Sequence, residues 1–185
     1  MLEIRWHSRA GQGAVTGAKG LGDIVSDTGK QVQAFAFYGS AKRGAAMSAY
    51  NRIDDKPILN HEKFMIPDYV LVLDPALAFI GNITANEKED TKYIITTHLS
   101  KKELLEKLPN LDEKRVYTLD CMKISQETIG RAIPNTPMLG ALMKVSGMFE
   151  IDYFKNAIIK VLSKFPQKIV DANLKAIQRA YEEVV

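Results

Sequence analysis

The sequence of 185 residues contains a single cysteine, Cys121, and no long uninterrupted apolar segment. One thiol cannot form a disulfide framework, a four-cysteine zinc site or an iron–sulfur cluster. No apolar run approaches the roughly 20 residues that a membrane-spanning helix requires. Residues 1–4 have the pattern of a strand and lack the basic and apolar regions of a signal peptide. We therefore expect a cytoplasmic protein without membrane contact, whose redox partners, if it has any, hold the metal clusters.

The chain also lacks the residue groupings of common catalytic, metal and nucleic-acid sites. His7, His61 and His98 are scattered without the spacing of metal ligands, so no metal site is expected. No Ser-His-Asp or paired-carboxylate arrangement is present, and no catalytic residue is assigned. Seven Lys and Arg residues accompany three acidic ones in residues 1–52. This bias suits a small anionic ligand but is too weak to indicate a nucleic-acid groove.

Length and composition fit a single domain spanning residues 1–185, with 46% hydrophobic and 25% charged residues. Apolar strands alternate with helical segments, which predicts an α/β fold. We expect a mostly parallel central sheet with helices on both faces, in a Rossmann-like single domain. The expected strands are residues 2–7, 31–37, 45–52, 70–74, 92–97 and 115–119. The expected helices are 14–28, one that begins at a Ser100–Glu103 capping box, 138–147, 152–164 with an Asp152 cap, and 167–184.

Two of the expected helices carry patterns that predict packing. Gly17, Gly20 and Gly22 lie inside the first helix, where each glycine costs roughly 1 kcal/mol relative to alanine. Such glycines indicate that the helix backbone approaches a neighbouring element closely. The last helix carries one apolar stripe that docks on the domain's own sheet or, in part, on another subunit. The stripe consists of Val170, Leu174, Ile177, Tyr181 and Val184.

A glycine-rich loop joins the first strand to the first helix and contains Gly11, Gln12 and Gly13. Glycines let a ligand approach the backbone, and the following helix N-terminus directs N–H groups outward, which favours a phosphate. Thr16 occupies the position of the third glycine of a dinucleotide fingerprint, and residues 31–37 contain no acidic residue, so NAD binding is disfavoured. The alternative is that the glycines only form a tight turn.

Other residues are candidates with simpler explanations. Lys42 and Arg43 form a cationic loop that is expected at the same sheet edge as the glycine loop, or else they are solvated surface charges. Cys121 has no histidine neighbour and is expected to be an inert, half-buried thiol. His7 is expected to be a hydrogen-bonded core residue in preference to a ligand. Asp74 ends a central strand and is expected to cap the helix that follows.

Three segments, in this order and in a chain of this length, resemble one family over essentially the whole sequence. They are RWHSRAGQGAVTGAK, YGSAKRGAAMSAYNRI and NTPMLGAL. The family is the gamma subunit of 2-oxoacid:acceptor oxidoreductases. The sequence of the glycine segment is most similar to that of the pyruvate:ferredoxin or flavodoxin type.

The resemblance implies a non-catalytic subunit of a complex that oxidatively decarboxylates pyruvate with coenzyme A to acetyl-CoA and carbon dioxide. Electrons pass to ferredoxin or flavodoxin. Thiamine diphosphate and the iron–sulfur clusters lie on partner subunits of the alpha, beta and delta types, and no nucleic acid or membrane takes part. The alternatives are a gamma subunit of the 2-oxoglutarate type, a purely structural assembly subunit, and a freestanding nucleotide-binding enzyme.

The second segment departs from the family pattern at Ser40, Ala41 and Ala45 but keeps Arg43 and gains Lys42. On this basis we expect that coenzyme A phosphates contact the cofactor-binding residues of this chain at an interface with its partners. These residues are Gly11, Gln12, Gly13, Lys42, Arg43, Asn135 and Thr136.

Overall fold

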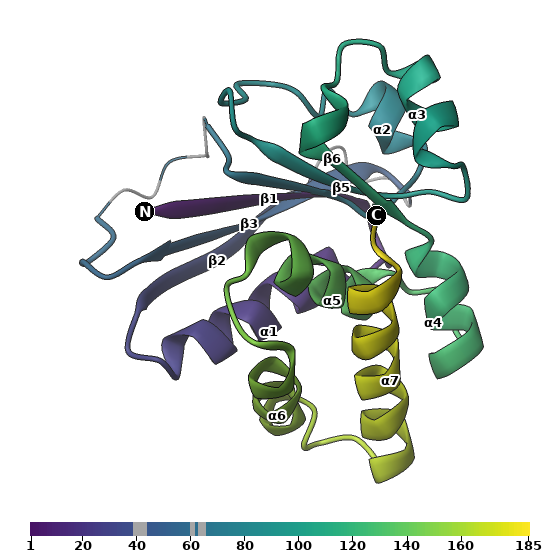
Figure 1. Cartoon of the computed structure of the whole chain (residues 1–185). Helices are drawn as coiled ribbons and strands as arrows, with labels where there is room; N and C mark the ends of the chain where they lie inside the picture. Colours follow the sequence, from purple (N-terminus) through teal and green to yellow (C-terminus); the bar gives the residue numbers. More distant parts are fainter. Residues whose placement is uncertain (39–43, 60–61, 63–65) are drawn as a thin grey trace.

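A six-stranded sheet forms the centre of the computed structural model, which describes residues 1–38, 44–59, 62 and 66–185 (Figure 1). The strand order is β2-β3-β1-β4-β5-β6. The strands are β1 (Leu2–Arg9), β2 (Gln31–Tyr38), β3 (Ala46–Asp54), β4 (Tyr69–Val72), β5 (Lys92–Thr96) and β6 (Val116–Leu119). All six expected strands are present, with their ends shifted by no more than about two residues.

The sheet is mostly parallel, as predicted, and β3 is the exception. β1 pairs with β4, β4 with β5 and β5 with β6 in parallel, whereas β3 is antiparallel to both β1 and β2. β2 ends at Tyr38 and β3 begins at Ala46. Parallel neighbours need a crossover of a dozen or more residues, so this short connection requires an antiparallel hairpin.

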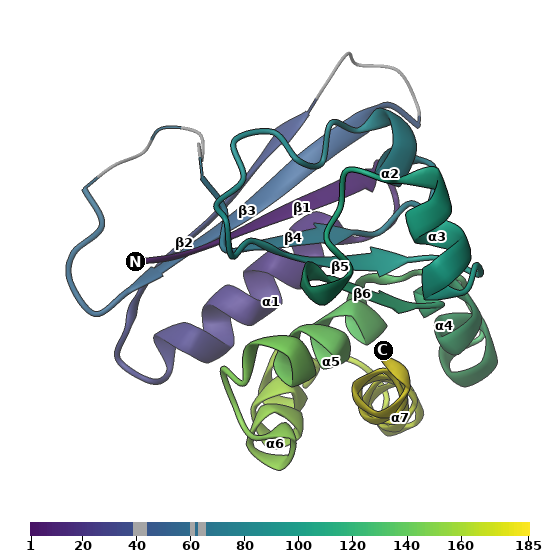
Figure 2. The same cartoon turned by 45° about the horizontal axis from the view of Figure 1, so that its top comes forward.

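Helices cover both faces of the sheet, as predicted (Figure 2). One layer contains α1 (Ala14–Ser26), α4 (Cys121–Ile129), α5 (Asn135–Ser146), α6 (Ile151–Val161) and α7 (Gln167–Glu183). The other contains α2 (Leu77–Ile80), α3 (Lys101–Lys107) and the 3₁₀ turn Glu113–Arg115. The segment of β4 contributes to both layers. Leu71, and Leu73 just after the strand, belong to the core of the first layer, whereas Val70 and Val72 belong to that of the second.

The helix boundaries confirm some expectations and correct others. Ser100 accepts a hydrogen bond from the Glu103 backbone and Glu103 returns one, which confirms the capping box. The Asp152 cap is wrong, because α6 begins at Ile151 and Asp152 lies in its first turn, where a carboxylate still complements the helix dipole. The helix α4 was not expected. Its start is marked by Asp120, whose side chain accepts from the Lys123 backbone.

Two of the three interior glycines of α1 mark close packing. A Cβ atom on Gly17 would lie 3.1 Å from the indole of Trp6, and one on Gly22 would lie 3.2 Å from Val32. Gly20 has ordinary space, with Val161 at 3.6 Å. The prediction of close packing is therefore confirmed at Gly17 and Gly22 and is wrong at Gly20.

The apolar stripe of α7 docks within the domain, on other helices. Val170 and Ile177 are buried in the helical layer, where α7 lies against α5 and α4. The α5 and α7 backbones approach so closely that a Cβ atom on Gly140 would lie 2.2 Å from the carbonyl oxygen of Ile177. This stripe therefore stabilises the domain itself.

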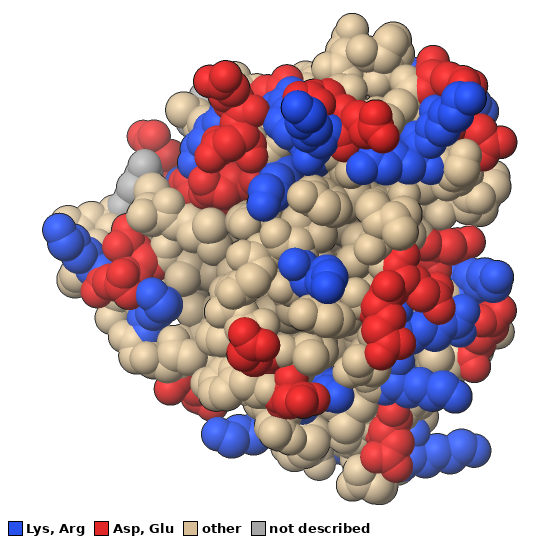
Figure 3. Space-filling model, in the orientation of Figure 1, with Lys and Arg blue, Asp and Glu red and all other residues tan. Residues whose placement is uncertain are grey.

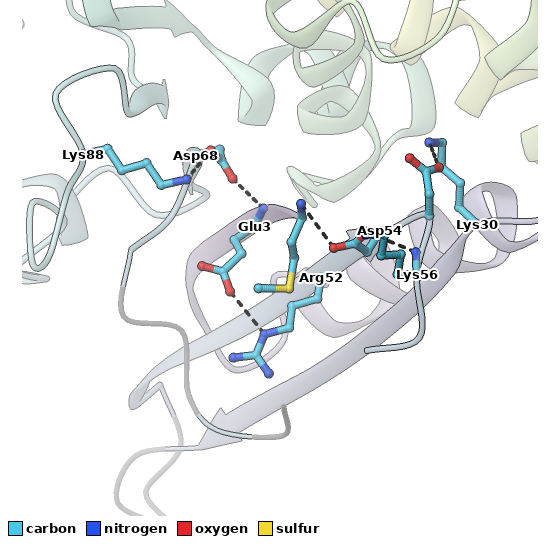
Figure 4. A network of polar contacts seen from close by, with 9 residues as sticks. Glu3, Lys30, Arg52, Asp54, Lys56, Asp68 and Lys88 are labelled. Carbon is cyan, nitrogen blue, oxygen red and sulfur yellow. Dashed lines mark hydrogen bonds and ion pairs between the residues drawn. The ribbon is translucent and has the colours of Figure 1, made fainter. Parts of the chain in front are cut away.

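Paired charges gather at the end of the sheet where β1, β2 and β4 begin and the antiparallel β3 ends, away from the glycine loop (Figure 4). Arg52, which is almost fully buried, bonds Glu3 at 3.2 Å, and the Glu3 backbone donates to Asp68 at 2.7 Å. The amino terminus pairs with Asp54 at 3.2 Å. Figure 3 shows acidic and basic side chains next to one another along the margins of one face, around a mainly uncharged centre. No described helix has the length and apolar character needed to cross a membrane.

Candidate functional site

An apolar crevice opens beside the glycine loop, between α1, α5, α6 and α7. Its volume is about 340 Å³, within the usual range for small-ligand sites. Four of the predicted site residues line it, namely Gly11, Gly13, Asn135 and Thr136. The other lining residues are Thr16, Gly17, Gly20, Ile129, Ile133, Leu139, Ile158, Val161, Leu162, Phe165, Ile169 and Asn173.

The two loop glycines occupy left-handed conformations for which glycine is the best residue. Gly11 has φ of 97° and Gly13 has φ of 83°. Among the described residues, no atom beyond the chain neighbours lies within 4 Å of the position of a Cβ on Gly11, so the backbone there is accessible from their side. At Gly13 the same position is 2.7 Å from Nδ2 of Asn135. Gly13 is therefore required by packing within the chain, whereas Gly11 is accessible.

The side chain of Gln12 bonds other parts of the chain. Its Nε2 donates to Asp74 at 2.7 Å, and its Oε1 accepts from the Arg9 backbone at 2.8 Å and the Ser8 hydroxyl at 3.3 Å. Gln12 is not among the residues that line the crevice. Its side chain therefore fixes the shape of the loop, and a ligand contact from this residue has to come from its backbone.

Sequence reasoning missed the ion pair that ties this loop to its neighbours. Arg9 Nε lies 3.2 Å from Asp74, and its Nη1 donates to the Gly44 carbonyl oxygen at 2.8 Å. The end of β1, the residues after β4 and the residue Gly44 before β3 thus meet at one end of the sheet. Asp74 also accepts from the Ala76 backbone at 3.0 Å, just before α2. The only signal in the sequence was that an arginine and an aspartate each follow a strand.

Asn135 and Thr136 lie at the start of α5, against the start of α1. The Thr136 backbone donates to Asn135 Oδ1 at 2.9 Å, and the Thr136 hydroxyl donates to Asn173 Oδ1 at 2.9 Å. Asn173 in turn donates to the Ile169 carbonyl oxygen at 2.7 Å. Asn173 was not predicted, because it lies within the apolar periodicity of α7. These bonds leave the amide nitrogen of Asn135 facing Gly13 at the end of the crevice.

The starts of two helices converge at this point and give it a positive potential. Gly13 is the residue before α1 and Pro134 is the residue before α5. Neither helix has an acidic residue in its first turn. Unpaired N–H groups at helix starts attract anions. At α5 the Thr136 N–H already donates to Asn135 Oδ1 and Pro137 has no N–H, so the N–H groups come mainly from the start of α1. The geometry favours an anionic group at Gly11–Gly13 with an apolar part along the crevice.

Two predicted residues, Lys42 and Arg43, lie outside the described residues. The bond from Arg9 to Gly44 nevertheless shows that the end of this hairpin reaches the glycine loop. A second hollow, of about 460 Å³, lies at the opposite sheet edge. Its charged groups pair with one another, for example Lys30 with Asp55 at 2.5 Å.

The remaining candidates are core residues. Cys121 is completely buried, and burial raises the pKa of its thiol to about 12, which confirms an inert cysteine and corrects its expected half-burial. His7 lies in the core, as predicted, but among the described residues the hydrogen bond expected for it is not found at Nε2. Burial, with a smaller effect of Arg5, lowers the pKa of His7 to about 3. Within the described ranges no group of three His, Cys, Asp or Glu residues is placed to hold a metal ion.

Comparison with known proteins gives consistent matches over the whole chain. Residues 3–183 match the family described as "Pyruvate ferredoxin/flavodoxin oxidoreductase". A Pyrococcus abyssi protein named "Pyruvate/ketoisovalerate oxidoreductases common subunit gamma" is 42% identical over 183 residues, which cover 99% of this chain and 97% of that protein. A Thermotoga maritima protein named "Pyruvate synthase subunit PorC" is 40% identical over 184 residues, which cover 99% of this chain and 94% of that one.

Solved structures agree on the fold. The crystal structure of pyruvate oxidoreductase subunit PORC from Thermotoga maritima has a TM-score of 0.83 and 37% identity, covering 100% of this chain and 97% of that one. The 2-oxoglutarate:ferredoxin oxidoreductase from Magnetococcus marinus was solved with 2-oxoglutarate, coenzyme A and succinyl-CoA bound. Its TM-score is 0.75 at 15% identity, over 98% of this chain and 30% of that chain, which shows a shared fold.

Proposed function

Because the chain belongs to the pyruvate ferredoxin/flavodoxin oxidoreductase family, we propose that it is the gamma subunit of a complex that oxidatively decarboxylates pyruvate. The complex uses coenzyme A, forms acetyl-CoA and carbon dioxide, and passes electrons to ferredoxin or flavodoxin. The observation that carries this proposal is likeness over the full chain, at 40% identity and a TM-score of 0.83, to proteins named as subunits of such enzymes.

The chemistry of the chain supports a role without catalysis. Among the described residues, those that line the crevice include no histidine, cysteine, carboxylate or lysine that could act as a base or nucleophile. A single buried cysteine cannot supply the thiolate ligands of an iron–sulfur cluster. We therefore assign the clusters to the partner subunits, and with them the thiamine diphosphate at which decarboxylation takes place.

The choice of 2-oxoacid also belongs to the partners in this proposal. The Pyrococcus abyssi relative is named as a subunit common to pyruvate and ketoisovalerate oxidoreductases. A subunit that serves two 2-oxoacids does not itself distinguish them. A ketoisovalerate-oxidising complex that shares this chain is accordingly a second candidate function.

The part that this chain plays toward coenzyme A is to hold its phosphates. Gly11 and Gly13 offer backbone N–H groups at the start of α1, and Asn135 and Thr136 lie at the start of α5 on the same crevice. Anions bind at such helix starts. Arg43, with Lys42 in support, remains a predicted contributor from the neighbouring hairpin.

Reconstitution of the complex tests this function. The complex is assembled from separately purified subunits with and without this chain, and pyruvate-dependent reduction of ferredoxin or flavodoxin is followed. Activity is expected only with both the chain and coenzyme A present. Turnover by the isolated chain, or full activity without it, would contradict the proposal.

A second experiment addresses the phosphate contact. Arg43→Ala and Asn135→Ala are expected to raise the apparent KM for coenzyme A in the assembled complex, with the KM for pyruvate unchanged. A purely structural subunit would instead lose assembly while the complexes that do form keep their normal KM for coenzyme A.

A further inference from the structure

Two hydrogen bonds of Asn173 join α7 to the start of α5. Asn173 is 7% exposed, and both polar atoms of its side chain are used. Its Nδ2 donates to the Ile169 carbonyl oxygen at 2.7 Å, and its Oδ1 accepts from the Thr136 hydroxyl at 2.9 Å. A carbonyl oxygen can only accept, so the bond to Ile169 fixes which end of the amide faces Thr136. Asn173 therefore presents an acceptor to Thr136.

This acceptor determines what the Thr136 hydroxyl can offer to a ligand. A hydroxyl has one proton to donate and two lone pairs that accept. The Thr136 proton is committed to Asn173, so toward the crevice, which both residues line, the Thr136 oxygen can only accept. Turning the proton toward a ligand would leave the Oδ1 of a buried amide without this partner, which is unfavourable.

Asn135, the neighbour of Thr136, has the opposite polarity. Its Oδ1 accepts from the Thr136 backbone at 2.9 Å, so its amide nitrogen, which is a donor, is the atom nearest to Gly13. The oxygen of an ionised phosphate is an acceptor, so it suits the nitrogen of Asn135 and does not suit the oxygen of Thr136. The two adjacent side chains therefore distinguish the acceptor groups of a ligand from its donor groups.

We infer that Asn173 is a positioning residue of this site, which holds the Thr136 hydroxyl as an acceptor for a hydroxyl or N–H group of the bound ligand. The inference rests on the proposed function, in which coenzyme A binds at this crevice. Coenzyme A carries such donors in addition to its phosphates. The phosphate contact then belongs to Asn135 and the glycine loop, whereas Thr136, which was expected to contact a phosphate, contacts a different part of the ligand.

Single variants in the assembled complex give the first test. Thr136→Val removes the hydroxyl and is expected to raise the apparent KM for coenzyme A by about five-fold, with kcat and the KM for pyruvate unchanged. Thr136→Ser keeps a hydroxyl and is expected to keep the normal KM. Asn173→Leu removes the acceptor that holds the Thr136 proton, and is expected to raise the KM for coenzyme A by about two-fold.

The double variant Thr136→Val/Asn173→Leu separates positioning from a purely structural role. Because both partners of the hydrogen bond are replaced by apolar groups, thermal stability is expected to return close to that of wild type. The KM for coenzyme A is expected to stay about five-fold raised, because the acceptor is still missing. A normal KM in this variant would show that the hydroxyl contacts no ligand. A lowered KM in Asn173→Leu would show that the freed proton bonds a phosphate. Either result overturns the inference.

Inhibition by pyrophosphate separates the inference from the proposed function. Ionised pyrophosphate offers acceptor oxygens, and it is expected to compete with coenzyme A. Asn135→Ala is expected to raise its inhibition constant by about five-fold, whereas Thr136→Val leaves this constant unchanged. A rise in Thr136→Val would overturn the inference and keep the phosphate contact. If pyrophosphate does not compete, or if Asn135→Ala changes neither this constant nor the KM for coenzyme A, the proposed phosphate contact fails.

Thr28→Val is the matched control for the threonine variants. The Thr28 hydroxyl also donates to an acceptor of this chain, the Val25 carbonyl oxygen at 2.6 Å, but it lies beyond the far end of α1 and does not line the crevice. Its loss is expected to change neither the KM for coenzyme A nor the inhibition by pyrophosphate. An effect of Thr28→Val as large as that of Thr136→Val would show that the change in KM does not come from the site, and would overturn the inference.

Discussion

Gly13 and Asn135 meet where α1 and α5 begin, and a Cβ atom on Gly13 would lie 2.7 Å from Nδ2 of Asn135. Gly13→Ala is therefore expected to displace the Asn135 amide and to strain a backbone with φ of 83°. We expect a loss of about 1–3 kcal/mol in unfolding free energy and weaker coenzyme A binding. Urea denaturation and calorimetric titration measure the two effects.

Gly11→Ala is the control for this change. Gly11 shares the left-handed conformation, but its Cβ position is open, so strain is expected without displacement of Asn135. Equal effects of the two variants on binding would show that the contact with Asn135 is irrelevant to the site.

Gln12→Glu tests the role of this side chain in fixing the loop. The variant replaces the Nε2 donor, which lies 2.7 Å from Asp74, with a carboxylate oxygen. This oxygen repels the carboxylate of Asp74. We expect a loss of about 1–3 kcal/mol at neutral pH, which lessens at acidic pH as a carboxyl proton restores the donor. Gln167→Glu, in an exposed pair with Asp171 at 2.8 Å, is the matched control and should change little. Equal losses of stability in both variants would show that the hydrogen bond from Gln12 to Asp74 does not fix the loop.

The helix α1 offers a matched pair of glycine substitutions. Gly20→Ala finds ordinary contact distances and is expected to raise stability by up to about 1 kcal/mol. In Gly17→Ala the new Cβ would lie 3.1 Å from the fully buried ring of Trp6. This substitution is expected to lower the stability by about 1–2 kcal/mol. Thermal unfolding should move by roughly 2–4 °C per kcal/mol for a chain of this size. Shifts of the same sign would refute this account of the helix packing.

Cys121 is expected to resist thiol reagents in the folded protein. It is fully buried, and a pKa near 12 leaves it protonated at pH 7 to 9, where a reagent needs the thiolate. Reaction with a chromogenic disulfide should release about one equivalent only after denaturation. Rapid labelling of the native chain would show that this core is open.

Stability is expected to fall in acid partly through His7. Its folded pKa is about 3, below the usual 6.5, so the unfolded chain takes up a proton first as the pH decreases. The contribution is complete above pH 6.5 and is lost as the pH falls toward 3, amounting to up to about 3 kcal/mol by pH 4. The difference in unfolding free energy between wild type and His7→Gln should therefore shift by this amount between pH 7 and pH 4. A difference independent of pH would contradict a buried neutral imidazole.

The elements were predictable because each depends on local sequence. Val70, Leu71 and Val72 predicted a strand buried on both faces, and Ser100 with Glu103 predicted a helix start. The helix α4 was missed because it is short and weakly apolar on average, although Cys121, Ile124 and Ser125 are buried at helical spacing. The direction of β3 was missed because the pattern of buried residues does not record which neighbours a strand pairs with.

The candidate site was predictable only in part. Gly11 and Gly13 could be predicted as site residues because the backbone conformation that they adopt depends on only a few neighbouring residues. Asn173 and the clamp between Arg9, Gln12 and Asp74 gave no comparable signal, because each is an ordinary polar residue until its partner is known.

The sequence by itself determined an α/β chain with a phosphate-compatible loop and no cysteine set for a metal cluster. Only the tertiary structure decided that α1 and α5 begin at the same point, that Gln12 faces inward, and that an apolar crevice extends to Phe165. Backbone conformation and capping are local, so neighbouring residues encode them. A crevice arises where helices far apart in the chain pack, and the burial that brings them together is a property of the whole core.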